Sequence, residues 1–269
     1  MKINRLVNGV IVGDLIGKYE AGRKFRPVET IEFTEQTVND RWRIRIPRFL
    51  AEYSGWWDTW EKERHLSMSQ HLKPGMTFFD VGTSDGWQSI LYALMLGGPQ
   101  RMVLIEPTAE VWPNIKLIWE QNRLAMPKAC YLGFLADSDT DQGCVHFGCW
   151  PDGPDYSHFL KGRAFTLLDD QGDAFVPRRK LDTLASLVRW PDAINVDVEG
   201  AELLVLRGAE ETLKSRHPLV WVSVHPEFMD KGFHHTPRML HEFMSDCGYN
   251  GKLLAIDHEE HHLFTANSN

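Results

Sequence analysis

The stretch INVDVEGAE, residues Ile194–Glu202, decides the fold of this chain. Apolar residues at alternate positions give a short strand, and Gly200 then opens a helical run, ELLVLRGAEETL, that ends before Pro218. A buried parallel strand that feeds a helix places its last side chains at the carboxyl edge of a sheet, where open α/β folds bind ligands. The stretch therefore predicts an open α/β sheet with a ligand site at this edge.

Three carboxylates crowd this predicted edge: Asp197, Glu199 and Glu202. They repel one another and lose solvation, so a cation, a metal or a proton in transfer is expected to compensate them. The alternative is a helix N-terminus that carries acids, because carboxylates favour the positive end of the helix dipole. That alternative explains Glu202 but not Asp197, which the pattern places inside the strand. We therefore take Asp197 and Glu199 as candidate catalytic residues and Glu202 as a first-turn helix acid.

The chain around this stretch alternates between strand and helix patterns. Strands are expected at residues 76–81, 101–105, 130–136, 193–198 and 219–224, helices at 87–96, 109–123 and 237–247, and a final hairpin at 252–256 and 262–266. Such alternation is typical of a doubly wound, mostly parallel sheet, here with an antiparallel C-terminal hairpin strand.

The first 70 residues do not follow this alternation. They show a half-exposed strand at residues 41–46 and a helix at 57–72, so residues 1–70 are interpreted as an N-terminal appendage on the substrate side. Residues 71–269 then form the main domain. Residues 138–180 interrupt it with scattered Gly, Pro and Asp, and we interpret them as a loop insertion that faces the substrate.

Composition limits the classes of function. The net charge of −8 and the pI near 5.8 argue against partners such as nucleic acid or an anionic membrane. No apolar run reaches the length of a membrane helix, and the N-terminus lacks the pattern of a signal peptide. Four cysteines form no CxxC pair, so free thiols in the cytoplasm are expected. The sequence leaves a homo-oligomer open.

The turn after the first main-domain strand, DVGTSDGW, indicates the cofactor. A dinucleotide needs GxGxxG, whereas Gly82 and Gly86 here give GxxxG, and Asp80 and Asp85 bring negative charge to the place of a phosphate. S-adenosylmethionine carries a sulfonium and an ammonium group, which carboxylates attract. The turn therefore favours S-adenosylmethionine, with Thr83 among the loop contacts.

Two further acids follow the next strands. Glu106, which precedes Pro107, ends the second strand, where a carboxylate can accept both hydroxyls of a ribose. Asp137 ends the expected third strand and is placed to approach the adenine amino group. For each acid alone, a loop carboxylate or a helix cap is an equal alternative. Their repetition at successive strand ends favours cofactor binding.

The segments DVGTSDGW, IEP, KLDTL and INVDVEGAELLVLRGAEETL together resemble the FkbM family of S-adenosylmethionine-dependent methyltransferases. The resemblance extends over roughly residues 72–224. It implies a Rossmann-like class I methyltransferase sheet of seven strands and, in general, methylation of hydroxyl groups on sugars or natural products. Thr83, Ser84 and Asp85 stand where an Ala-Asn type of turn is commoner in the family.

The resemblance therefore implies an O-methyltransferase acting on a sugar, a glycan or another small hydroxylated acceptor. An aliphatic hydroxyl needs a general base or a metal, and His225, at the end of the fifth strand, is the base candidate by residue type. The alternative for His225 is a structural role, in which the imidazole holds a loop by a hydrogen bond. No metal is the first expectation, although Asp197, Glu199 and His225 could instead hold a divalent cation. N- or C-methylation, or cofactor binding without turnover, are the alternative functions.

One motif points elsewhere. The run His258-Glu259-Glu260-His261-His262 matches the HExxH pattern of zinc proteases. That pattern needs a helix and a third ligand further along, whereas this run leads into an expected strand near the end of the sequence. A polar hairpin turn is the expected structure.

Overall fold

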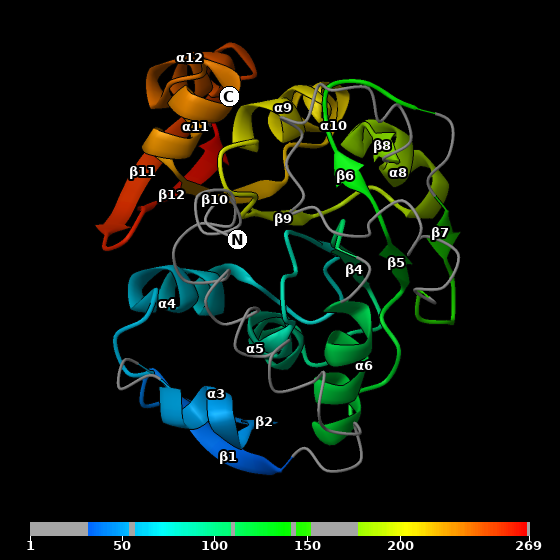
Figure 1. The fold of residues 1–269 in the computed structure, drawn as a ribbon. Coiled ribbons are helices and arrows are strands. Elements are labelled where there is room, and N and C mark those ends of the chain that lie inside the picture. Colours follow the sequence, from blue (N-terminus) through cyan, green and yellow to red (C-terminus); the bar gives the residue numbers. More distant parts are fainter. Residues whose placement is uncertain (1–31, 54–56, 109–110, 141–143, 152–176, 268–269) are drawn as a thin grey trace.

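The computed structural model describes residues 32–53, 57–108, 111–140, 144–151 and 177–267. Its central sheet has eight strands among these residues, in the order β11-β12-β10-β9-β3-β4-β5-β7 (Figure 1). In chain order they are β3 (Phe78–Val81), β4 (Met102–Ile105), β5 (Ala129–Tyr131), β7 (Val145–His146), β9 (Ala193–Val196), β10 (Leu219–Val224), β11 (Tyr249–Ile256) and β12 (Glu260–Ala266).

The five inner strands, from β5 to β10, are parallel, and β12 joins β10 in the antiparallel sense. This confirms the doubly wound, mostly parallel sheet with an antiparallel C-terminal hairpin. The strand β7 adds an antiparallel edge beside β5, which makes one strand more than the expected seven. Strand β3 lies between β4 and β9, so the residues that follow β3 and β9 are neighbours at the carboxyl edge.

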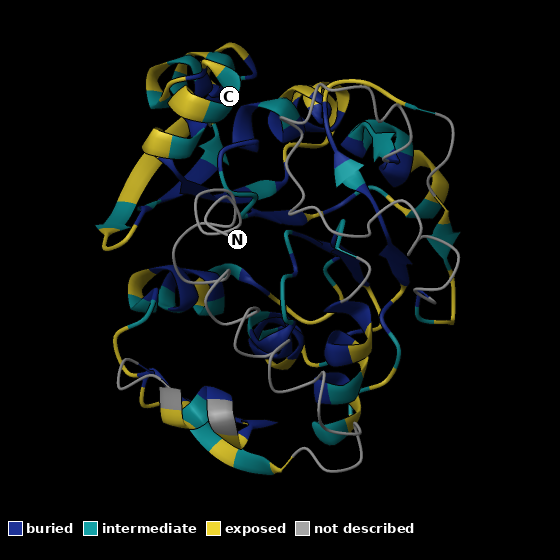
Figure 2. Ribbon diagram, in the orientation of Figure 1, coloured by how far each residue is buried: buried dark blue, intermediate teal, exposed yellow. Residues whose placement is uncertain are grey.

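Helices cover both faces of the sheet. On one face lie α4 (Lys62–His71), α5 (Trp87–Met95) and α6 (Trp112–Gln121), and on the other lie α8 (Leu181–Val188), α9 (Glu202–Arg207), α10 (Glu210–Arg216), α11 (Pro226–Phe233) and α12 (Pro237–Asp246) (Figure 1). The inner strands are apolar and buried, as a sheet covered on both faces requires (Figure 2). None of the described helices is long and apolar enough to span a membrane.

The N-terminal strands form their own small sheet. β1 (Phe33–Val38) and β2 (Trp42–Pro47) pair in the antiparallel sense, and α3 (Arg48–Tyr53) follows. Ile44 and Ile46 are buried, whereas Arg43 and Arg45 are exposed, as the alternation predicts. The buried side chains of β2 join the same hydrophobic cluster as α5 and α6, so this small sheet packs on the main domain.

The expected third strand, residues 130–136, is wrong as a single element. The central sheet receives only β5, while β6 (Phe134–Leu135) pairs in parallel with β8 (Arg178–Arg179) in a separate sheet. Gly133 lies between β5 and β6 with φ +159°, and a Cβ there would lie 2.8 Å from the carbonyl oxygen of Pro177. The close approach of these two backbones turns the chain off the sheet.

Other boundaries also differ from the sequence prediction. The expected helix after Gly200 is two helices, α9 and α10, with Gly208 at the end of the first. The helix expected from residue 57 begins only at Lys62, because Glu61 has a left-handed backbone. The strand expected at 193–198 ends at Val196, so Asp197 follows the strand rather than lying within it. Of the insertion 138–180, residues 141–143 and 152–176 lie outside the described residues.

Candidate active site

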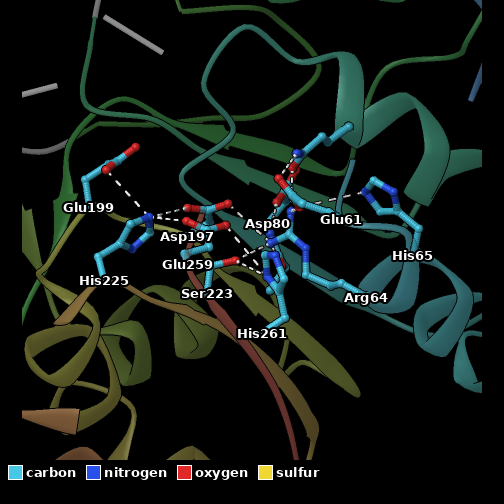
Figure 3. A network of polar contacts seen from close by, with 12 residues as sticks. Glu61, Arg64, His65, Asp80, Asp197, Glu199, Ser223, His225, Glu259 and His261 are labelled. Atoms are coloured by element: carbon cyan, nitrogen blue, oxygen red, sulfur yellow. Dashed lines mark hydrogen bonds and ion pairs between the residues drawn. The ribbon is translucent and has the colours of Figure 1, made fainter. Parts of the chain in front are cut away.

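Three neighbouring strands bring the candidate residues together at the carboxyl edge of the sheet. Asp80 is near the end of β3, Asp197 follows β9, and His225 follows β10. Because β3, β9 and β10 are adjacent and parallel, their ends meet. The side chains form one connected network of polar contacts (Figure 3).

The glycine turn after β3 is shaped by its backbone. Gly82 has φ +90°, and a Cβ at this position would lie 1.7 Å from the carbonyl oxygen of Asp197. Thr83 donates its hydroxyl to the carbonyl oxygen of Asp80, and Gly86 precedes α5 with φ +86°. Burial raises the pKa of Asp85 to about 6, against a backbone hydrogen bond from Trp87 that lowers it. The turn therefore opens α5 and lies directly against the segment that carries Asp197.

Glu106 faces the same turn from the end of β4. Its carboxylate accepts hydrogen bonds from the backbone nitrogens of Ser84, at 2.9 Å, and Thr108, at 2.8 Å. Burial raises the pKa of Glu106 to about 7, against these hydrogen bonds, which lower it. The Thr108 side chain also hydrogen-bonds to this carboxylate. Because a carboxylate accepts about four hydrogen bonds, some acceptor capacity remains for a ligand. Pro107, which follows it, is partly buried.

Asp80 is held from two sides inside the protein. Ser89 donates a short hydrogen bond to one oxygen, and Asn195 donates a 2.9 Å hydrogen bond to the other. Asp80 is 1% exposed, and burial raises its pKa to about 6. Its two oxygens already have protein partners, so this acid fixes the end of β3 to α5 and to β9.

Asp137 does not follow a strand of the central sheet, unlike the other predicted cofactor residues. It is exposed and follows β6, which belongs to the small sheet, so it does not end a strand of the central sheet as predicted. The correction follows from the turn at Gly133, where the chain leaves the sheet before Asp137 is reached. A contact between Asp137 and adenine stays a prediction.

His225 lies among four carboxylates. Its Nδ1 donates to Glu202 at 2.8 Å, and its Nε2 contacts Glu259 at short range. The same Nε2 lies 3.8 Å from Asp197 Oδ1 and 3.6 Å from Glu199 Oε2 (Figure 3). An imidazole that faces a carboxylate with each ring nitrogen is protonated on both. Accordingly, although burial lowers it, the pKa of His225 is raised well above its usual value by Glu259 and Glu202.

The two candidate catalytic acids differ in their surroundings. Asp197 is paired with Arg64 at 3.2 Å and its side chain is 18% exposed. Glu199 has a left-handed backbone, φ +53°, and a side chain that is 30% exposed. Its Oε2 accepts no hydrogen bond from any described residue. Burial raises the pKa of Glu199 to about 7, while His225 lowers it.

Glu202 has a second role besides that of the first-turn helix acid predicted from the sequence. It is the first-turn acid of α9, as predicted, and it accepts a 2.8 Å hydrogen bond from the backbone nitrogen of Gly200. The same oxygen accepts from His225, and the side chain is fully buried. Glu202 therefore belongs to the network around His225.

Sequence reasoning missed several charged residues of this network, among them Arg64, its partner Glu61, and Glu259. Arg64 comes from α4, and a charged residue in a polar helix is usually on the solvent side. Glu259 lies in the turn of the C-terminal hairpin, which confirms the hairpin expected for the HExxH run. The density of acids and histidines in that run was the available signal, but the sequence alone did not connect it with His225.

Asp197, His225 and Glu259 each offer a ligand atom within 4.8 Å of the other two. The predicted alternative of a metal site thus gains Glu259 in place of Glu199, which is not part of this group. Inside the group, however, His225 and Glu259 already form an ion pair, whose short contact and further hydrogen bond to Glu202 offset the cost of burying the two charges.

The order of the sheet is that of a doubly wound α/β fold, in which ligands bind at the carboxyl edge where the strand order reverses, here beside β3. Residues 80–250 match the family described as the Methyltransferase FkbM domain, and the chain belongs to this family. This confirms the resemblance seen in the sequence and identifies a methyltransferase domain of this family in the chain. No curated protein matches the chain in sequence.

Several solved structures are similar in fold at low identity. The methyltransferase FkbM of Methylobacillus flagellatus KT is 16% identical with a TM-score of 0.47, over 72% of this chain and 44% of that one. The precorrin-6y C5,15-methyltransferase of Geobacter metallireducens GS-15 is 10% identical with a TM-score of 0.44, over 77% and 88%. The fibrillarin of Aeropyrum pernix, with bound S-adenosyl-L-methionine, is 12% identical with a TM-score of 0.43, over 88% and 100%. The present chain thus spans less than half of the Methylobacillus protein.

The residues of the β3 turn fit S-adenosylmethionine. Gly82 keeps the backbone of the turn free of side-chain bulk, and the buried Glu106 retains acceptor positions for ribose hydroxyls. Asp85 supplies further negative charge for a cationic ligand. These three residues would hold the cofactor directly, and Asp80, whose two hydrogen bonds also leave acceptor positions, stays a predicted cofactor contact.

Proposed function

We propose that the protein transfers a methyl group to a hydroxyl oxygen of a sugar, a glycan or another small hydroxylated acceptor, with Glu199 as the general base. S-adenosylmethionine supplies an activated methyl group on a sulfonium. In the transfer the carbon–oxygen bond forms as the carbon–sulfur bond breaks, and the sulfur keeps the electron pair and becomes a neutral thioether. The hydroxyl proton must pass to a base, and Glu199 is assigned to take it.

The observation that carries this assignment is that Oε2 of Glu199 accepts no hydrogen bond from a described residue. It is held only by a 3.6 Å ion pair with His225, whose two nitrogens also face Glu202 and Glu259. A protonated imidazole cannot accept a proton, whereas a partly exposed carboxylate with a pKa of about 7 is matched to work near neutral pH. His225 is therefore assigned the role of the cation that orients Glu199 and Asp197. This differs from the sequence prediction of His225 as the base.

The net charge of the chain supports a neutral hydroxylated molecule as the acceptor. The net charge of −8 disfavours nucleic acid and anionic membranes as acceptors and favours neutral hydroxylated molecules. Residues 1–70 and 138–180 are proposed to provide the contacts with the acceptor, beside the domain formed by residues 71–269. From the composition we also propose a cytoplasmic location.

The test is a screen of acceptors with labelled S-adenosylmethionine, using free sugars, sugar nucleotides, glycans, amines and RNA oligonucleotides. Transfer to a hydroxyl is the expected outcome. Transfer only to amines or carbon acids would replace it by N- or C-methylation, and binding of the cofactor without transfer to any of them would support a protein without turnover.

The role of Glu199 is tested with the acceptor found. Glu199→Gln is expected to lower kcat by about 100- to 10,000-fold, the usual contribution of a general base. The Kd for S-adenosylmethionine should stay as in the wild type, because Glu199 is not among the cofactor contacts. The control is Glu227→Gln, an exposed acid in the first turn of α11. A Glu199→Gln variant with an unchanged kcat would contradict the assignment.

A further inference from the structure

The segments on either side of the family-matched region, before residue 80 and after residue 250, both contribute residues to the candidate active site. Arg64, on α4, precedes residue 80, and Glu259, in the hairpin turn between β11 and β12, follows residue 250. Helix α4 packs against both strands of that hairpin. Trp60 stacks on His258 with ring centroids 4.0 Å apart, so the two flanks also touch beside the site.

Arg64 contacts the cofactor side and the acceptor side at once. Its side chain is fully buried. Its Nη1 donates to Asn195 and Asp197, both at 3.2 Å, and to Ser223 at 2.8 Å. Its Nη2 donates to Gln88 at 2.8 Å and pairs with Glu61 (Figure 3). Asn195 in turn holds Asp80 of the cofactor strand.

Asp197 lies between two cations as a result. Its Oδ2 accepts from Arg64, and its Oδ1 faces His225 Nε2 at 3.8 Å. Burial raises the pKa of Asp197, as does Glu259, while Arg64 and His225 lower it. Without Arg64, the carboxyl would lose both a fixed orientation and one of the charges that favour its ionised form.

Glu259 completes the chain on the other side of His225. Its side chain is 2% exposed, one oxygen pairs with His225 Nε2, and the other lies 3.3 Å from His258. Burial would raise the pKa of Glu259, but His225 holds it well below its usual value. Positive and negative groups therefore alternate along the line Glu61, Arg64, Asp197, His225 and Glu259.

We propose that Arg64 and Glu259 are positioning residues of this methyltransferase, which fix Asp197 and His225 from the two flanks of the family-matched region. This proposal rests on the proposed function, because the step that the two residues would serve is the methyl transfer proposed above. It assigns to the N-terminal helix α4 and to the C-terminal hairpin a direct part in the site. Neither residue touches the reacting atoms; each acts through its partner.

The role of Arg64 is tested by a double-mutant cycle with Asp197. Arg64→Lys keeps the charge but cannot make the paired contacts of the two guanidinium nitrogens. It is expected to lower kcat at least tenfold in the wild type and less than twofold in an Asp197→Asn background, because the partner is already lost. Lys62→Met, which removes an exposed charge from the same helix, is the control. An equal loss in both backgrounds would show that Arg64 does not act through Asp197.

The role of Glu259 is tested without catalysis, by titrating the 15N-labelled imidazole of His225 in the intact protein by NMR. The groups that face this imidazole are Asp197, Glu199, Glu202, Glu259 and the ring of Phe228. Glu259→Gln is expected to lower the pKa of His225, and Glu260→Gln, one residue further on, to leave it unchanged. An unchanged pKa in Glu259→Gln would overturn the proposal for the hairpin.

The two tests separate this proposal from the proposed function. If no hydroxyl acceptor is methylated, the proposed function fails, while the titration of His225 still decides whether Glu259 positions it. Circular dichroism of each variant establishes that it is folded. If Glu259→Gln does not fold, Glu259→Asp takes its place, because a shorter carboxylate changes the distance to His225 but keeps the charge.

Discussion

Gly82 and Asp197 are in backbone contact: a Cβ at Gly82 would lie 1.7 Å from the carbonyl oxygen of Asp197. The turn of the candidate cofactor site and the segment that carries the candidate catalytic acids therefore cannot move independently. The backbone nitrogen of Asp197 also donates a 2.9 Å hydrogen bond to the carbonyl oxygen of Val81, which fixes the register of the two segments.

Gly82→Ala is predicted to weaken cofactor binding and to destabilise the fold, because the new methyl group must displace the Asp197 backbone. The free energy of unfolding, from urea titrations, and the Kd for S-adenosylmethionine, from calorimetry, measure the two effects. Gly75→Ala is the matched control, since Gly75 has almost the same φ, +91°, with no atom within 4 Å of the new Cβ. It should cost about 1–2 kcal/mol, the penalty of a left-handed backbone alone. A Gly82→Ala variant no worse than Gly75→Ala would contradict the close contact.

The parts of this site that the sequence predicted are those set by local pattern. Buried parallel strands are continuous apolar runs, so the ends of β4 and β10, and with them Glu106 and His225, could be placed from the sequence, and Asp197 to within a residue of the end of β9. The strand at residues 130–136 was misread because the backbone contact at Gly133 involves Pro177, which is distant in sequence. Asp137 therefore follows β6 of the small sheet and does not end a strand of the central sheet.

Arg64 and Glu259 could not be predicted, for a related reason. Arg64 lies 133 residues before Asp197 in the sequence, and nothing in the composition of α4 shows that its arginine is buried. A buried charge is stable only with its partners, and these partners come from β9, β10, α5 and the residue before α4. Only the assembled fold brings them together.

Asn195→Asp is predicted to destabilise the protein progressively as the pH rises. Asn195 donates to Asp80 and accepts from Arg64, so the aspartate keeps the second contact but places a carboxylate beside Asp80. The pKa of Asp80 is already raised to about 6 by burial, and a neighbouring acid raises it further. The expected loss is about 1–3 kcal/mol at neutral pH, the cost of an unsatisfied buried polar group. Urea unfolding at pH 5 and pH 8 measures it. Asn250→Asp on the exposed part of β11 is the control and should show no such pH dependence.

Glu199→Gln is predicted to make the stability of the protein less dependent on pH. Burial raises the pKa of Glu199 from 4.5 to about 7, so the folded state binds more protons than the unfolded state between these values. The stabilising effect of that proton is complete below pH 4.5 and is lost as the pH rises through 7. The free energy of unfolding of the wild type should therefore fall from pH 5 to pH 8, and that of Glu199→Gln should fall less. Each pKa unit corresponds to about 1.4 kcal/mol at most. Glu63→Gln, at an exposed position of α4, should follow the wild type, and parallel curves for all three proteins would contradict the raised pKa.

The transfer is predicted to need no divalent metal. Asp197, His225 and Glu259 are close enough to share an ion, but a metal ligand must be a neutral imidazole, and the carboxylates on both sides of His225 favour the imidazolium. The ion pair of His225 with Glu259 thus supplies the positive charge that a metal would otherwise bring to these acids. Activity should be unchanged in EDTA, and elemental analysis of the purified protein should find no stoichiometric metal. If EDTA abolished activity and Mg²⁺, Mn²⁺ or Zn²⁺ restored it, the charge beside these acids would come from a metal ion and not from the imidazolium. Glu259→Gln should then lower the affinity for that ion.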